Sequence, residues 1–437
     1  TFLQKKHLVS KKPQIMTKFI FFITVFNTFF GFSQTVSTIA GTTPGYFDAP
    51  GEFAQFSGVT GICADNTGNI YVVDSGNNRI RKIDTTNDNM VSTFAGSGVE
   101  GYEDGIGTTA AFAGPNGICI DTQNNLYITD FWNYKIRKIT PAGVVTTVAG
   151  TTQGFTDGNG ITAKFGYLEG ICIDSQNNLY VADAGNHKIR KITPTGIVST
   201  VAGTISGYLD GAGSVAKFDY PNGICIDSNN NLYVAEAFGA KIRRITPSNI
   251  VNTIAGSNSG FLNGQGISAK FFYPTGICTD NLGNLFVADN GNHKIRKIAT
   301  TGMVTTYAGI DYGFLDGDIN TALFCSPQGI MTTVDGTIYV TQACGNPSIR
   351  KITSILNIEN FVSKKMILFP NPNNGSFEIS LENKCSITIY NFIGKKVYFE
   401  NNIIDNKIIN TNLPKGIYII EIKDNIEKSN FIKMIIK

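Results

Sequence analysis

A six-residue phrase that recurs along the chain constrains the fold more than any other feature. The phrase has the form V-x-T-h-A-G, where h is apolar, and it ends at Gly41, Gly96, Gly150, Gly203, Gly256 and Gly309. Consecutive glycines are 55, 54, 53, 53 and 53 residues apart. A fixed period of this length is typical of a chain that folds as repeated structural units rather than around one continuous core.

Each repeat contains four runs of strand length. The phrase is followed by a glycine-rich stretch such as 207–211, then by Gly-Ile-Cys, by a run such as Leu232–Ala235, and by Lys-Ile-Arg-Lys-Ile. Four short strands per unit are the pattern of a β-propeller blade. Glycine is abundant, at 47 of 437 residues, and only 16% of residues are charged, which suits short strands joined by turns. The six repeats therefore predict an all-β fold, a six-bladed β-propeller.

The phase of the repeats predicts how the ring closes. The last unit has strand-length runs at 329–334, 337–342 and 348–353, but no V-x-T-h-A-G phrase follows them. The first such phrase, Val36–Ala40, has no blade before it. We therefore expect this N-terminal strand to complete the sixth blade as its outer strand, which would remove two exposed sheet edges.

Two further phrases carry a family resemblance. P-x-G-I, as at Pro274–Ile277, and N-L-F-V-A-D-N-G-N-H-K-I-R-K-I, at Asn284–Ile298, resemble the NHL repeat. The resemblance covers Thr35 to Thr353, in a propeller domain that we place at 34–353. It implies a propeller, and most NHL proteins are platforms that bind protein, RNA or glycans. Some related six-bladed propellers are lyases or metal-dependent lactonases, so the fold alone does not decide the function.

The N-terminal segment has the pattern of an export signal. Lys18 follows the first methionine, Met16, and an apolar stretch covers 19–32, with small Gly31 and Ser33 just before Gln34. This stretch is short for a membrane span, and it predicts a signal peptide at 16–33. The alternative is a buried N-terminal helix. We interpret 1–15 as a mis-called extension of the reading frame.

The composition changes after Thr353, where a linker is predicted at 354–364 and a small β-sandwich at 365–437. Its motifs begin with Phe369-Pro370-Asn371-Pro372, and Leu413 later precedes Lys415-Gly416-Ile417-Tyr418. They resemble the C-terminal sorting domain of the type IX secretion system. The resemblance implies export by that machinery across the outer membrane of a Gram-negative bacterium, removal of the domain, and release or attachment at the cell surface. The alternative is an ordinary accessory β-domain.

The charge balance argues against nucleic acid as a partner. Lys and Arg number 36 and Asp and Glu 33, so the formal net charge of +3 gives little attraction for phosphate backbones. We expect a monomer whose mature chain has no transmembrane segment, and a partner that is a protein, a glycan or a small molecule.

The cysteines of the repeats fall into two groups. One group occupies the same inner-strand position in five repeats and is interpreted as small buried apolar side chains, because equivalent positions in a ring lie too far apart for disulfides: Cys63, Cys119, Cys172, Cys225 and Cys278. Cys325 and Cys344 have no counterparts in other repeats and are predicted to form a disulfide in an exported protein. Unpaired surface thiols are the alternative for this pair.

Function is expected where the repeats differ, since the repeated residues build the fold. The position before the inner-strand glycine carries Asn116, Glu169 and Asn222 in adjacent blades, a channel mouth with one carboxylate between two amides. Oxygen ligands of this kind suit Ca²⁺, although a solvated mouth that holds no ion is the simpler reading. The second candidate is an aromatic ligand-binding surface on loops, formed by Phe131, Trp132, Tyr134 and Phe238.

These observations predict an exported binding protein and assign no catalytic residue. No nucleophile elbow, phosphate loop or zinc spacing occurs in the sequence. No cofactor is expected, apart from Ca²⁺ if the channel mouth holds an ion. The alternative is a metal-dependent hydrolase or lactonase-like enzyme, or a lyase-like enzyme, with its site in the central channel.

Overall fold

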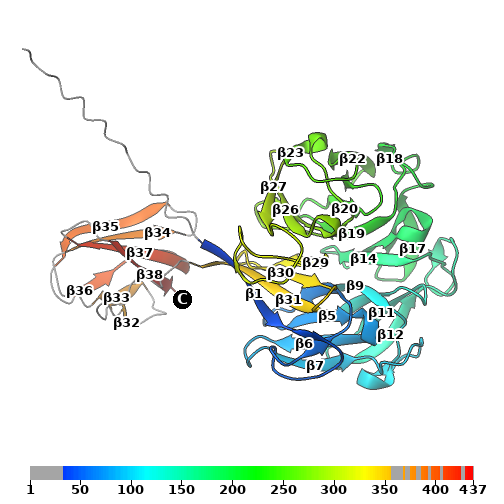
Figure 1. Cartoon of the computed structure of the whole chain (residues 1–437), viewed down its shortest axis with the longest axis horizontal. Coiled ribbons are helices and arrows are strands. Elements are labelled where there is room, and N and C mark those ends of the chain that lie inside the picture. The colour runs from blue at the N-terminus through cyan, green and yellow to red at the C-terminus, as the bar shows by residue number, and fades with distance from the viewer. Residues whose placement is uncertain are drawn as a thin grey trace, which may run out of the picture. The chain divides into compact units, whose positions relative to one another are not determined.

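The chain folds as β-sheets. The computed structural model describes residues 33–355, 368–369, 375–379, 385–391, 395–403, 407–424 and 429–436 (Figure 1). Within them, the helical elements are single 3₁₀ turns of three residues: η1 (Ser75–Asn77), η2 (Gly107–Thr109), η3 (Ala184–Asn186), η4 (Gly266–Ser268) and η5 (Asn290–Asn292). In this part of the chain, no helix has the length and apolar character needed to cross a membrane. The all-β prediction is confirmed.

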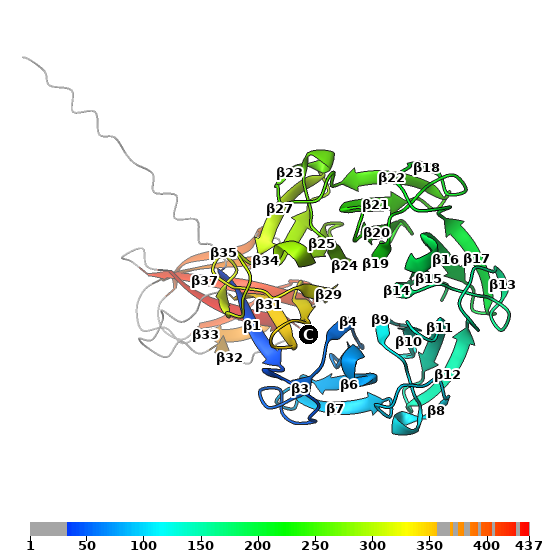
Figure 2. The same cartoon turned by 45° about the vertical axis from the view of Figure 1, so that its right-hand side comes forward.

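Residues 33–355 form repeated sheets of four or five antiparallel strands, as a propeller requires. Figure 2 shows the sheets around a common centre, each with one strand nearest to it. The innermost strands are β4 (Val59–Ala64), β9 (Pro115–Ile120), β14 (Leu168–Ile173), β19 (Pro221–Ile226), β24 (Pro274–Thr279) and β29 (Pro327–Thr332). The second strands are β5 (Ile70–Asp74), β10 (Leu126–Asp130), β15 (Leu179–Asp183), β20 (Leu232–Glu236), β25 (Leu285–Asp289) and β30 (Ile338–Gln342).

The outer half of each sheet comes from the K-I-R-K-I run and the V-x-T-h-A phrase. The third strands are β6 (Arg79–Asp84), β11 (Lys135–Ile139), β16 (Lys188–Ile192), β21 (Lys241–Ile245), β26 (Lys294–Ile298) and β31 (Ser348–Ile355). The fourth strands are β7 (Met90–Ala95), β12 (Val144–Ala149), β17 (Ile197–Ala202), β22 (Ile250–Ala255), β27 (Met303–Ala308) and, beside β31, β1 (Ser33–Ala40).

The glycine-rich stretches add short fifth strands that the sequence analysis did not foresee: β8 (Gly105–Ile106), β13 (Gly158–Asn159), β18 (Gly211–Ala212), β23 (Gly264–Gln265) and β28 (Gly317–Asp318). The sheet of β4 to β7 has four strands, and a separate parallel pair lies nearby in sequence, β2 (Thr43–Pro44) and β3 (Gln55–Phe56).

The N-terminal strand pairs with the last repeat, as the phase of the repeats predicted. β1 runs antiparallel to β31, with Val36 opposite Ile352, and it also pairs with β28 (Figure 1). Two boundaries differ from the sequence analysis. β1 begins at Ser33, the last residue of the predicted signal peptide, and β31 runs through Ile355, into the predicted linker. The predictions for 1–32 and 356–364 lie outside the described residues.

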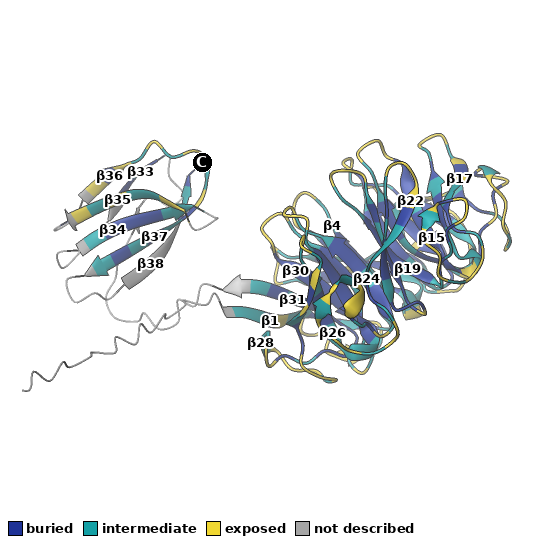
Figure 3. Cartoon of the chain, turned by 90° about the horizontal axis from the view of Figure 1, so that it is seen from above, coloured by how far each residue is buried: buried dark blue, intermediate teal, exposed yellow. Residues whose placement is uncertain are grey.

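The core lies between neighbouring sheets, so the inner strands are covered on both faces and are largely buried (Figure 3). One cluster joins Cys119 and Ile136 of one sheet to Phe165 and Val181 of the next repeat. This two-sided burial explains why the inner strands are continuously apolar rather than alternating. The five matched cysteines are free and buried, which confirms that they form no disulfides among themselves.

Each repeat contains a buried arginine that links separate parts of the repeat. In the third repeat, Arg190 donates to Asp183 at 2.7 Å and to Asp157 at 2.6 Å, and its guanidinium lies 5.0 Å from the centre of the Phe165 ring. The equivalent arginines of the other repeats are also buried: Arg81, Arg137, Arg243, Arg296 and Arg350. Asp183 ends the second strand β15 and Asp157 lies in the preceding glycine-rich stretch, so Arg190 links these two parts of the repeat.

The innermost strands approach one another backbone to backbone. A Cβ on Gly117 would clash with the carbonyl oxygen of Glu169, and a Cβ on Gly329 would clash with that of Thr60. Contacts between innermost strands run from β4 to β9, β14, β19, β24 and β29, and from β29 back to β4. A side chain larger than hydrogen at these positions would push neighbouring sheets apart.

The C-terminal region has its own core between two sheets. One sheet has the order β32 (Leu368–Phe369), β33 (Ser376–Ile379), β36 (Lys407–Asn410), and the other β35 (Lys396–Ile403), β34 (Cys385–Asn391), β37 (Gly416–Asp424), β38 (Ser429–Ile436). Phe377 and Ile409 of the first sheet pack with Ile387, Ile420 and Met434 of the second. The predicted sandwich is thus present.

Candidate functional site

The predicted channel mouth contains a buried hydrogen-bonded carboxylate. Asn116 and Glu169 occupy the second positions of β9 and β14, and the Asn116 amide donates a short hydrogen bond to Glu169 Oε2. The Tyr220 hydroxyl donates to Glu169 Oε1 at 2.8 Å. Glu169 is only 6% exposed. The strand geometry therefore brings two of the three predicted residues together and adds a tyrosine.

Asn222 lies at the matching position of β19 but takes no part in these hydrogen bonds. Among the hydrogen bonds of residues 33–355, none joins the Asn222 side chain to Glu169. Asn222 is half-buried, so its amide remains available for a ligand next to the buried pair.

Burial controls the protonation of Glu169. Loss of hydration raises the pKa of this carboxyl to about 7, and the hydrogen bonds from Tyr220 and Asn116 oppose that rise in part. Each carboxylate oxygen already accepts one hydrogen bond, which leaves one further acceptor position on each. Among the described residues, no three His, Cys, Asp or Glu side chains gather closely enough to hold a metal ion.

The loop between β10 and β11 forms an aromatic group with a residue of the next repeat. The Phe131 ring stacks on Tyr167 with centroids 4.9 Å apart, and the Trp132 ring meets Tyr167 edge-on at 5.4 Å. Tyr134 is tilted against Tyr167 at 5.8 Å. The three predicted aromatic residues thus gather on Tyr167, two positions before Glu169, while Trp132 stays 54% exposed.

A second aromatic group continues the surface on the following repeats. The Phe238 ring lies 4.6 Å from the Tyr220 ring and 5.6 Å from the Tyr273 ring, measured between centroids. Phe238 is 56% exposed. Because Tyr220 also bonds to Glu169, the two aromatic groups flank the buried carboxylate. We call Trp132, Tyr167, Tyr220, Phe238 and Tyr273, with Glu169 between them, the mouth surface.

The three tyrosines of this surface were not predicted, although the sequence holds a signal for them. They occupy one repeat position, two residues before the channel-mouth position that was compared. The other repeats carry Gly58, Gly114 and Ser326 there. A column that changes from small residues to tyrosine in three consecutive repeats marks a departure from the repeat.

The two histidines of the repeats bond to the backbone just before two of the innermost strands. His187 Nδ1 accepts a hydrogen bond from the Tyr220 backbone at 3.4 Å, and His293 Nδ1 accepts one from Ser326 at 3.1 Å. Burial lowers the pKa of His293, which keeps the accepting nitrogen unprotonated. These contacts are structural.

A disulfide lies at the end of the last repeat where its innermost strand, β29, begins. Cys325, which precedes β29, is bonded to Cys344, which follows β30, with Cα atoms 5.6 Å apart. The bond ties two loops of the sheet that contains the N-terminal strand β1.

Comparison with known proteins identifies both parts of the chain. The NHL repeat model matches residues 56–83, 112–139, 165–192 and 271–298, and the secretion system C-terminal sorting domain model matches 367–437. Arabidopsis thaliana protein SUPPRESSOR OF QUENCHING 1, chloroplastic, is 29% identical over 269 residues, which are 56% of this chain and 25% of that protein. NHL repeat-containing protein 2 of Bos taurus is 27% identical over 306 residues, 61% of this chain and 42% of that protein. The chain thus spans less than half the length of either relative.

Solved structures share the fold. A protein of unknown function from Bacteroides thetaiotaomicron superposes with a TM-score of 0.57 and 21% identity, covering 74% of this chain and 76% of that one. An auxiliary nutrient binding protein from the same species gives a TM-score of 0.57 and 18% identity, covering 73% and 76%. At these identities the likeness concerns the fold alone.

Proposed function

We propose that this chain, which carries NHL repeats and a secretion-system C-terminal sorting domain, is an exported binding protein that holds a saccharide on the mouth surface. One observation carries the proposal. Trp132 and Phe238 expose more than half of their side chains, and each packs on tyrosines beside Glu169. Large rings exposed together on loops that depart from the repeat are typical of a binding anchor rather than of a fold element.

A sugar ring suits this combination of groups. It offers a flat face of C–H groups to an aromatic ring and an edge of hydroxyl groups to polar atoms. An ionised carboxylate can accept about four hydrogen bonds, and that of Glu169 accepts one from Asn116 and one from Tyr220.

We further propose that the sheets close into a six-bladed ring. The support is the contact of β29 with β4, the hydrogen bond from Thr341 Oγ1 to Thr60 O at 2.5 Å, and the pairing of β1 with β31. In this arrangement the first and last repeats meet as any two neighbours do. The N-terminal strand then fastens the ring through backbone hydrogen bonds, and we expect a monomer.

The sorting domain implies export through the type IX secretion system to the cell surface or beyond. We propose that residues 16–33 act as the signal peptide, that the mature chain starts at Gln34, and that the sorting domain at 365–437 is removed by a cut in the linker. The pairing of Gln34 with Ser354 suits these limits. Cleavage before Gln34 keeps β1 in its sheet, and the second cut has to fall after Ile355, where β31 ends.

The alternative from the sequence, a metal-dependent hydrolase or a lactonase-like or lyase-like enzyme, finds less support at the channel mouth. Glu169 is the single carboxylate at its repeat position, and its oxygens are engaged by Asn116 and Tyr220. A site of this kind offers an acceptor for ligand hydroxyl groups more readily than a ligand set for a metal ion.

The chain contains a natural reporter for this proposal, since Trp132 is its single tryptophan. A panel of soluble polysaccharides is titrated into the purified protein while Trp132 emission is followed. We expect a saturable change with at least one polysaccharide, lost in Phe238→Ala and kept in Phe53→Ala, which removes an exposed ring away from the mouth surface. If no saccharide of the panel gives a saturable change but a protein ligand does, the ligand is a protein rather than a saccharide. If Phe238→Ala and Phe53→Ala change the emission response equally, the mouth surface is not the binding site.

A further inference from the structure

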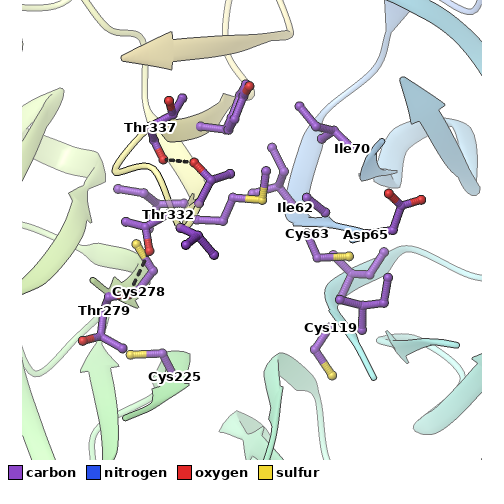
Figure 4. A pocket seen from close by; sticks show the side chains of 18 of the residues that line it. Ile62, Cys63, Asp65, Ile70, Cys119, Cys225, Cys278, Thr279, Thr332 and Thr337 are labelled. Atoms are coloured by element: carbon purple, nitrogen blue, oxygen red, sulfur yellow. Dashed lines mark hydrogen bonds between the residues drawn. The ribbon is translucent and has the colours of Figure 1, made fainter. Parts of the chain in front are cut away.

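The innermost strands enclose a cavity at the end opposite the mouth surface (Figure 4). It has a volume of about 780 Å³. Its wall comes from the later residues of these strands, such as Cys172 in the fifth position of β14, whereas Glu169 is in the second. Three residues along a strand correspond to about 10 Å, and no residue of the mouth surface lines the cavity.

Isoleucines and cysteines make up much of the wall, which also includes threonines and the charged residues Asp65, Asp335 and Lys351. All five matched cysteines line it together with Met331 and isoleucines from the innermost strands. Figure 4 shows Cys63, Cys119, Cys225 and Cys278 around an open centre. Each of the five thiols is 8–9% exposed, and all are unpaired. Cysteine behaves here as a small apolar residue, so the repeated choice of Cys keeps the centre of the ring open.

The cysteines of the wall carry no charge. Burial raises the pKa of each thiol, so the thiols are neutral at neutral pH. The charged residues of the lining are already engaged. Asp65 accepts hydrogen bonds from Thr67 and Asn69, Asp335 accepts from Thr333, and the Lys351 ammonium lies 5.9 Å from the centre of the Tyr339 ring.

We propose that this cavity is a second binding site, which takes a neutral apolar small molecule. Its volume is within the range of about 300 to 1,000 Å³ that is usual for small-molecule pockets. Against the isoleucines and neutral thiols, a charged ligand would lose hydration without finding a counter-charge, whereas an apolar ligand loses none and releases water from this surface. The proposal goes beyond the saccharide site, and neither depends on the other.

The test uses the purified full chain and the neutral fluorescent probe N-phenyl-1-naphthylamine. We expect saturable binding at one site. Cys225→Phe fills the cavity from its wall and should weaken binding by at least about tenfold. Cys225→Ser keeps the volume and should change the dissociation constant by less than about threefold. Trp132→Ala, at the opposite mouth, should leave probe binding unchanged.

A second measurement needs no substitution and decides the matter if Cys225→Phe fails to fold. The five cavity thiols of the native protein are alkylated slowly with a neutral reagent, with and without saturating probe, and counted by peptide mapping. Occupancy should slow their reaction together. The proposal is overturned if no saturable binding occurs, if Cys225→Phe binds as the parent does, or if bound probe leaves the five rates unchanged.

Discussion

The hydroxyl group of Tyr220 donates a hydrogen bond of 2.8 Å to Glu169, across 51 residues of sequence and from one repeat to the next. Tyr220 stands just before β19, with a left-handed backbone conformation at φ 56° that His187 supports through the Tyr220 amide. The bond connects a residue of the aromatic surface to the buried carboxylate. A ligand that stacks on these rings would therefore change the hydrogen bonding of Glu169.

The first prediction concerns the pH dependence of stability. The folded protein raises the pKa of Glu169 to about 7 from an ordinary value of 4.5, so the folded state binds the proton more tightly than the unfolded state. This contribution is fully present below pH 4.5 and is lost as pH rises through 7, a loss of roughly 2–3 kcal/mol. Urea unfolding of the parent and of Glu169→Gln between pH 4.5 and 8 measures it. The difference between the two proteins should change with pH by that amount, and a constant difference would contradict the assignment.

The second prediction concerns the buried arginines. Arg190→Met leaves Asp183 buried without its cation, and such a break costs about 3–5 kcal/mol. Removing the half-exposed partner, Asp157→Ala, should cost less, about 0–1 kcal/mol, because solvent screens that pair. Chemical denaturation gives both values. The double substitution Arg190→Met with Asp183→Leu should recover part of the loss, and equal costs for Arg190→Met and Asp157→Ala would contradict this role.

The sequence was sufficient for the architecture and less so for the site. Periodicity located the four main strands of each repeat, and phase identified β1 as the partner of β31, because both follow from local pattern and from the need to cover sheet edges. Tyr167, Tyr220 and Tyr273 could not be placed from one repeat, since their contacts with Phe131, Glu169 and Phe238 join different repeats. The cavity could not be predicted from the sequence for a similar reason. A cysteine at one strand position looks like a core residue until the sheets place several of them around a common space.

The third prediction concerns the cysteines. Cys325 and Cys344 should resist alkylation in unfolded protein that has not been reduced, while the five cavity cysteines should react fully under the same conditions. The crosslink closes a loop of 19 residues and should stabilise the fold by about 3 kcal/mol in the chain-entropy model. Peptide mapping and thermal unfolding of Cys325→Ser with Cys344→Ser give the two results. Free thiols at both positions would contradict the disulfide.

The fourth prediction concerns processing in the native host. Protein recovered outside the cell should begin at or near Gln34 and end after Ile355 but before the sorting domain, since this interval keeps β1 and β31 paired. Intact mass spectrometry of the secreted material checks both ends. A secreted species that retains Lys437 would contradict removal of the sorting domain.

Calorimetric titration of the saccharide found with the Trp132 reporter tests the central claim most directly. Trp132→Ala and Phe238→Ala should each weaken binding by about tenfold or more, since each removes an exposed ring at the centre of the surface, a loss of at least about 1.4 kcal/mol. Phe53→Ala should bind as the parent does. The account predicts this separation between the two mouth substitutions and the control, with all three proteins unfolding at similar temperatures. Saccharide binding of parent strength in both Trp132→Ala and Phe238→Ala would contradict it.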